Sequence, residues 1–405
     1  MDFLLLIGVI GSVSLDFLTN VFAYAGIQSP VVALLKGSIL LLIVANYRTL
    51  YSWAITLAFA GIFFIREFLI ATNSLESYLM DDAVFFSRIF FFIGWLLLFY
   101  ERRNRKEFLN CVLYVVVATF ILSVICQFAG YLLSLKFFKA YGEQRGGYKG
   151  LFFAENDTSV FYLFILIYAM YLWGVGRKIL TFIALLGLFF LGLGSKTALL
   201  GALIVPIIYF YFTHNFSFPI NIKKFSLRLR PLMYISIFLI IGIGVGYFLL
   251  FYIGSFLVAF NYDQLIRVYE QSGLLSSLLS FRDLKVALYF NNLNNLNDLI
   301  FGLQIKEKIK IFGLESPGTF MYEIDIFDYL GRVGLLGLML TIMTICRCTG
   351  LRRWGSATPE LKTLIFSIII LGLTVGHTLV SAMNGVWLGF WLILFSQLRY
   401  RRIEN

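Results

Sequence analysis

The stretch GLESPGTFMYEIDIFDYLGRVGLLG, residues 313–337, is where a polar interval of the chain gives way to an apolar one. Three carboxylates, Glu323, Asp325 and Asp328, lie directly before its apolar end. The stretch completes the long polar interval 261–328, and the chain on either side of that interval is strongly apolar. Because short turns are enough to join membrane helices, so long a polar connection predicts a functional role for it.

The composition defines the class of protein. The chain has 405 residues, of which 60% are hydrophobic and 14% charged, and its mean hydropathy is +0.87. Soluble domains carry about 25% charged residues. Apolar runs of about twenty residues recur along the chain, and each can cross about 30 Å of hydrocarbon as a helix. We therefore expect an all-α, polytopic membrane protein, and the same runs exclude a β-barrel.

About twelve transmembrane helices are predicted, in a single integral membrane domain that covers 1–405. The first apolar run follows Asp2 rather than a basic segment and shows no small-residue cleavage site, so it is interpreted as a retained span. The predicted spans are 3–22, 31–45, 50–70, 83–100, 108–134, 160–175, 179–194, 197–213, 232–257, 329–346, 361–378 and 383–397.

The net charge of +11 is explained by membrane topology rather than by a nucleic-acid partner, which we do not expect. Lys and Arg gather in alternate connections, and loops rich in these residues stay in the cytoplasm. The basic segments include 101–107, 223–230 and the C-terminal 399–402. This alternation places both termini in the cytoplasm and the interval 261–328 outside it.

Two shorter outer segments carry basic residues. Arg145 lies among Gly146, Gly147 and Gly150, with Lys149, Glu155 and Asn156 close behind. Glycines let the backbone turn tightly and expose its amides, which suits an anionic ligand, although a solvated basic loop explains the same residues equally well. Lys196 lies between two predicted spans, where it either binds an anion or extends its side chain to the membrane surface.

The long loop supplies the remaining candidates. Arg267 and Arg282 lie in its first part. The segment 280–290, SFRDLKVALYF, is predicted to form an amphipathic helix on the membrane. If 322–330 is helical, Asp325 and Asp328 share a face and Glu323 points away from them. If the chain is still extended there, Glu323 and Asp325 share a face instead. Asp328 also fits a plain helix-dipole role.

Other polar residues fall within or beside predicted spans. Arg66 and Glu67 are adjacent and predict a structural ion pair at least as strongly as a substrate path. Arg88 is a further intramembrane charge, and His377 is a candidate proton carrier that is more simply a polar cap. The predicted outer loops contain no HExxH motif and no carboxylate cluster with metal-ligand spacing, so no metal or other cofactor is expected.

The order of these motifs resembles the O-antigen polymerase and ligase superfamily of bacterial envelope enzymes. RGGYKGLFFAENDTSVFYL is followed by GLGSKTALLGALI across a helical hairpin. SFRDLKVALYF and NDLIFGLQ then come in the long loop, and MYEIDIFDYLGRVGLLGLML closes it. The resemblance covers about 140–340 and depends on the order and spacing of the motifs.

The resemblance implies a GT-C-like membrane glycosyltransferase in the bacterial cytoplasmic (inner) membrane, acting in O-antigen or capsule biosynthesis. It would join undecaprenyl-diphosphate-linked oligosaccharides on the outer face, without a cofactor. Arg145, Lys196 and Arg282 match the positions that bind diphosphate, with Lys196 standing where the ligases commonly have arginine. The ligases keep a histidine base where this chain has Glu323, with Asp325 beside it.

The implied partners are the lipid-linked oligosaccharide, the bilayer and, as a further candidate, a chain-length regulator protein. The substitution of an acidic segment for the ligase histidine favours a polymerase. The alternatives are an O-antigen ligase, which passes polymer to a lipid A core, and a flippase or exporter, which binds the same lipid without making a bond.

Overall fold

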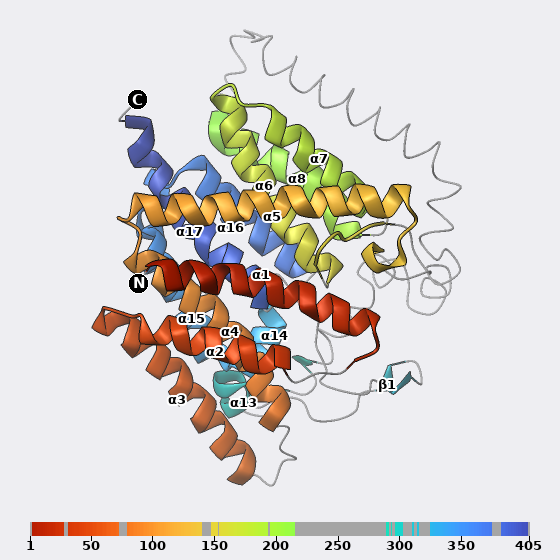
Figure 1. The fold of residues 1–405 in the computed structure, drawn as a ribbon. Helices are drawn as coiled ribbons and strands as arrows, with labels where there is room; N and C mark the ends of the chain where they lie inside the picture. Colours follow the sequence, from red (N-terminus) through yellow and green to blue (C-terminus); the bar gives the residue numbers. More distant parts are fainter. Residues whose placement is uncertain are drawn as a thin grey trace, which may run out of the picture.

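A computed structural model describes residues 2–27, 31–72, 79–139, 147–152, 154–192, 195–214, 289–290, 293, 296–302, 310–311, 314–315, 325–374 and 382–403. The described part of the chain is a bundle of helices (Figure 1). Its described strands are two residues each, β1 (Lys310–Ile311) and β2 (Leu314–Glu315), paired antiparallel. The all-α expectation therefore describes the architecture apart from this one small pair.

The helices occupy the positions that the apolar runs predict for spans one to eight, eleven and twelve, with ends that differ by a few residues. The first group is α1 (Asp2–Tyr24), α2 (Val31–Ala45), α3 (Leu50–Thr72), α4 (Leu79–Glu101), α5 (Lys106–Leu132), α6 (Glu155–Gly174), α7 (Ile179–Gly192) and α8 (Lys196–His214). The C-terminal group is α16 (Pro359–Thr374) and α17 (Ala382–Ile403). The predicted ninth span, 232–257, lies outside the described residues.

Four of these helices are long and apolar enough to cross a membrane. They are Asp2–Tyr24, Leu50–Ile70, Lys106–Leu132 and Asn156–Gly174, and five shorter helices are also apolar. Helices α1, α3, α5 and α7 carry exposed leucine, isoleucine and phenylalanine, the kind of surface that lipid tails cover. The chain is therefore a helical membrane protein.

The tenth predicted span, 329–346, is not one continuous helix. It divides into α14 (Asp325–Arg332) and α15 (Gly334–Thr349), and Gly334, the first residue of α15, has a φ of +68°. A residue in the left-handed region interrupts a right-handed helix, and hydropathy carries no signal for it. Span ten therefore begins with a separate short helix whose axis need not follow that of α15.

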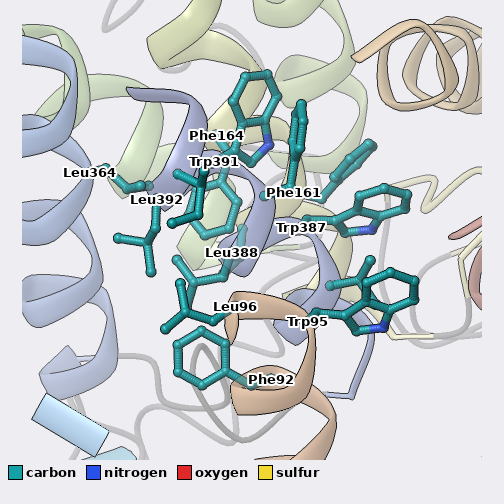
Figure 2. Close-up of a cluster of buried hydrophobic side chains, with 14 of the residues drawn as sticks. Phe92, Trp95, Leu96, Phe161, Phe164, Leu364, Trp387, Leu388, Trp391 and Leu392 are labelled. Carbon is teal, nitrogen blue, oxygen red and sulfur yellow. The ribbon is translucent and has the colours of Figure 1, made fainter. Parts of the chain in front are cut away.

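The core lies where α4 and α17 cross, with α6 and α16 packed around them (Figure 2). Gly385 and Gly389 are one turn apart on α17, and a Cβ at either would come within about 3.0 Å of the α4 backbone at Phe92 or Leu96. Small residues at this spacing let two membrane helices approach closely. Trp95, Trp387 and Trp391 fill the space around the contact and are fully buried.

One end of the bundle, here called the basic end, gathers the residues at 2, 46–49, 101–106 and 350–358 with the C-terminal half of α17. Arg105 pairs with Asp2, and Thr49 donates to Glu101. Gln397 of α17 donates to the carbonyl of Arg103 at 2.6 Å. The basic end is at the left of Figure 1, and the other end of the helices is at the right. The predicted cytoplasmic segments that are described thus meet at one end.

Candidate functional site

The opposite end of the bundle contains α14, whose sequence DIFDYLGR carries three charged residues on one helix face. Asp325, Asp328 and Arg332 are spaced by three and four residues, the spacing that brings side chains together on a helix. Their exposed fractions are only 2%, 1% and 8%. Burying ionised groups costs several kcal/mol each unless they are paired. A charged face buried in this way indicates either a structural network or a functional site.

Helices α16 and α4 both contact this face. A Cβ built on Gly372 of α16 would lie 3.1 Å from Oδ2 of Asp325, so glycine leaves the space that the carboxylate occupies. The guanidinium of Arg332 lies over the ring of Phe85 of α4, 5.0 Å from its centroid. This geometry is that of a cation–π contact, which fixes the cation without neutralising it.

A joint of two glycines holds α14 against α13 (Leu296–Phe301). Gly302 and Gly334 have φ values of +67° and +68°. A Cβ on Gly302 would lie 2.6 Å from the backbone nitrogen of Gly334, and one on Gly334 would overlap the carbonyl oxygen of Ile300. Both the left-handed conformation and the close backbone approach require glycine here.

Helix α3 is fastened to the same joint by Arg66. Its Nε donates to the carbonyl of Gly302 at 3.0 Å, and its Nη1 pairs with Glu67 Oε1 at 2.5 Å. Arg66 is 1% exposed. The ion pair predicted for Arg66 and Glu67 is therefore present, and the hydrogen bond to Gly302 adds a connection that their adjacency in sequence does not indicate.

A second polar group lies where α6, α8 and α17 begin. Asn384 Nδ2 of α17 donates to Asp157 Oδ1 of α6 at 3.3 Å, and Arg88 of α4 is within electrostatic range of Asp157. Thr197 of α8 donates to Asn156 Oδ1 at 3.2 Å. These contacts join three helix N-termini, where partial positive charge favours anions.

The segment 147–152 closes this end against α5. Gly147 and Gly150 have φ values of +99° and +68°, so the tight backbone that the glycine-rich sequence predicts is present at both. Gly150 packs directly on Ser123 of α5, and Gln127 Nε2 donates to the Tyr148 carbonyl at 2.7 Å. Lys149 is buried within this segment, and its backbone N–H donates to Phe138 at 2.8 Å.

The structure describes some of the predicted site residues and not others. Lys149, Asn156, Asp325 and Asp328 all lie at the end opposite the basic end. Lys196 begins α8, but its side chain is outside the described part. The remaining candidates also lie outside the described residues: Arg145, Arg267, Arg282, Glu323 and His377. The expected convergence of Arg145, Lys196 and Arg282 stays a prediction.

Of the two conformations considered for the segment that carries the carboxylates, helical and extended, the structure has the helical one from Asp325 onward. Helix α14 begins at Asp325, so Asp325 and Asp328 share a face, as the helical interpretation predicts. Sequence reasoning missed Arg332, although its position four residues after Asp328 is the signal that could have found it. It also gave no role to Asp157, whose contact with Asn384 has no local signal in the sequence.

Chemically, the α14 face offers buried carboxylates that can accept a proton and a guanidinium that can stabilise negative charge. Among the residues that the structure describes, no group of three or more His, Cys, Asp or Glu side chains has an arrangement that could hold a metal ion. Comparison with protein-family models, with curated proteins and with solved structures finds no match. The site must therefore be interpreted from its own residues.

Proposed function

We propose that the chain is a glycosyltransferase that polymerises oligosaccharide repeat units carried on undecaprenyl diphosphate, at the outer face of the bacterial cytoplasmic membrane. The observation that carries the proposal is the buried face of Asp325, Asp328 and Arg332 at the end of the bundle opposite the basic end. The motif order described above is its second support.

In the proposed reaction, a sugar hydroxyl of one lipid-linked oligosaccharide attacks the anomeric carbon of another. The bond from that carbon to the diphosphate oxygen breaks, and undecaprenyl diphosphate leaves with the bonding electrons. The hydroxyl proton passes to a carboxylate, for which Asp325 is the described candidate and Glu323 the adjacent one. A carboxylate beside apolar surface is suited to this role because burial favours its protonated form.

The leaving diphosphate carries negative charge that must be stabilised as the bond breaks. Guanidinium and ammonium groups can supply this stabilisation without a metal ion. Arg332 is the described cation on the α14 face. Arg145, Lys196 and Arg282 are the cations that the sequence adds to the proposal, and a chain-length regulator remains a proposed partner.

The test is to incubate purified protein with a defined undecaprenyl-diphosphate oligosaccharide and to separate the products by size. The proposal predicts a ladder spaced by one repeat unit, formed equally with and without a chelator. Transfer of preformed polymer to a lipid A core acceptor, without a ladder, would identify the ligase alternative. Movement of the intact lipid across a vesicle membrane without any new glycosidic bond would identify the exporter alternative.

A further inference from the structure

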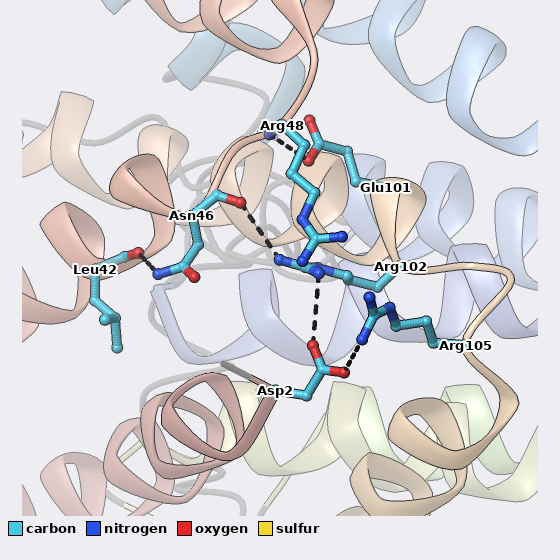
Figure 3. A network of polar contacts seen from close by, with 7 residues as sticks. All are labelled: Asp2, Leu42, Asn46, Arg48, Glu101, Arg102 and Arg105. Carbon is cyan, nitrogen blue, oxygen red and sulfur yellow. Dashed lines mark hydrogen bonds and ion pairs between the residues drawn. The ribbon is translucent and has the colours of Figure 1, made fainter.

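Three arginine side chains gather at the basic end, on the turns that join α2 to α3 and α4 to α5. Figure 3 shows the guanidinium groups of Arg102 and Arg105 directed at Asp2, with the guanidinium of Arg48 near that of Arg102 on the side away from Asp2. Asp2 Oδ2 is 2.5 Å from Arg105 Nη1, and its Oδ1 is 3.5 Å from Arg102 Nη1. We refer to Arg48, Arg102 and Arg105 as the arginine cluster.

The other nearby carboxylate, Glu101, is occupied by different donors. Its Oε2 accepts from the backbone N–H of Arg48 at 2.8 Å. Its Oε1 accepts from Thr49 N at 3.1 Å, Thr49 Oγ1 at 2.7 Å and Ser52 Oγ at 2.6 Å. Glu101 therefore holds the start of α3 in place, and its bonds go to the backbone and to hydroxyl groups rather than to the guanidinium groups.

Arg102 is the buried member of the cluster, with 0% exposure. Within the described part of the chain, its Nε and Nη1 make no hydrogen bond, and its Nη2 reaches the Asn46 carbonyl only at 3.5 Å. Burial lowers the pKa of Arg102, and the charge of Arg48 lowers it further. Buried cationic donors that lack acceptors are costly, and an added anion would relieve that cost.

Arg48 is the exposed member of the cluster. Among the described residues, its side chain makes no hydrogen bond or ion pair, although its guanidinium points at that of Arg102 (Figure 3). Arg105 is 48% exposed. Arg48 is exposed, and Arg105 keeps donors besides the Nη1 that pairs with Asp2. Together with the buried Arg102 they form a site for an oxyanion, because a guanidinium group can donate two parallel hydrogen bonds to phosphate.

We infer that the arginine cluster binds the phosphate of an anionic phospholipid headgroup. The cluster lies where apolar helices end. In a membrane protein such helix ends lie close to the lipid headgroups, where basic residues attract anionic lipid. Leu50, at 86% exposure, and the exposed Trp53 follow Arg48 on α3 and provide apolar surface for an acyl chain. A free phosphate ion would use only the guanidinium groups, so this neighbouring apolar surface favours a lipid. The inference does not depend on the proposed function.

The experiment uses the full chain in detergent and three probes: dioleoyl phosphatidylglycerol, dioleoyl phosphatidylcholine and inorganic phosphate. Bound lipid is counted by native mass spectrometry. Arg48→Gln removes the exposed guanidinium and none of the hydrogen bonds made by the described residues. Arg103→Gln is the matched control, because it removes the same charge from the basic end, in the α4–α5 connection, and the Arg103 side chain donates to the Tyr100 carbonyl at 2.9 Å instead.

The wild-type protein is expected to retain phosphatidylglycerol in preference to phosphatidylcholine. Arg48→Gln should lower the retained phosphatidylglycerol about fivefold, the effect of losing one surface arginine at about 1 kcal/mol. Arg103→Gln should leave it unchanged. Equal losses in the two variants would overturn the site in favour of a general basic surface. Competition by inorganic phosphate at concentrations equal to those of the lipid would overturn the lipid assignment.

Discussion

The two ends of the bundle use charge differently. At the basic end, charged groups belong to turns and helix termini and tie neighbouring helices together through Asp2 and Glu101. Asp2 and Arg105 remain partly exposed there, although Arg102 and Glu360 are buried. At the opposite end, charges lie within helices and are buried, as in Arg66 and the α14 face. Exposed ion pairs change the free energy of folding little, whereas burying a charge carries a large desolvation penalty. We therefore expect buried charges to have a structural or functional role. The comparison therefore directs functional tests to α14.

The largest effect is expected from Asp325→Asn, which keeps the shape of the side chain and removes its capacity to accept a proton. Loss of a general base lowers the rate by about 100-fold or more. The control is Glu360→Gln, since Glu360 is also a fully buried carboxylate but bonds Tyr209 at the basic end. Initial rates of polymer formation should fall in the first variant and stay within about threefold in the second. Equal rates in both variants would remove Asp325 from the site.

The second prediction compares the free energies of unfolding of two variants, each of which lacks one arginine. Arg66→Leu removes the partner of Glu67 and the donor to Gly302, and breaking a buried pair costs about 3–5 kcal/mol. Arg105→Leu removes a half-exposed pair with Asp2, which costs about 0–1 kcal/mol. Unfolding free energies in mixed micelles measure both. A loss from Arg105→Leu as large as that from Arg66→Leu would contradict the contrast between the ends.

Two glycines with the same backbone conformation provide the third test. Gly334 and Gly350 have φ values of +68° and +72°, but a Cβ on Gly350, at the basic end, would meet nothing within 4 Å. Gly350→Ala should cost about 1–2 kcal/mol from the left-handed conformation alone. Gly334→Ala adds an overlap with Ile300, for a total of about 2–5 kcal/mol in the same unfolding assay. Equal losses of unfolding free energy in the two variants would mean that the backbone at Gly302 and Gly334 shifts to accept the added Cβ without a penalty.

The sequence predicts the helices well because apolar runs report directly on burial in lipid. It does not predict the break before Gly334, because hydropathy carries no signal for one left-handed residue. Spacing alone indicates that Asp325 and Asp328 share a helix face. The contact between Asp157 and Asn384 joins residues 227 positions apart, and no local pattern in a single sequence encodes it.

The smallest effect concerns Glu101 and pH. Burial raises the pKa of Glu101, but hydrogen bonds from Ser52, Thr49 and the backbone outweigh burial, so the net pKa lies below its ordinary value. A lowered carboxyl pKa stabilises the fold above about pH 4.3, and this contribution is lost as the pH falls through the folded-state value. The difference in Tm between wild type and Glu101→Gln should therefore be largest near neutral pH and shrink in acid. A difference that is constant across pH would exclude this linkage.

The most direct test of the central claim is to ask which end of the bundle faces outward. The four native cysteines are first replaced by serine, and a single cysteine is then introduced as Ile27→Cys, beyond α1 at the end opposite the basic end, or as Gly355→Cys at the basic end. Both positions are exposed. In intact spheroplasts, a membrane-impermeant maleimide should label Ile27→Cys and should reach Gly355→Cys only after lysis. Labelling of Gly355→Cys in intact spheroplasts, with Ile27→Cys protected, would contradict an outward-facing site.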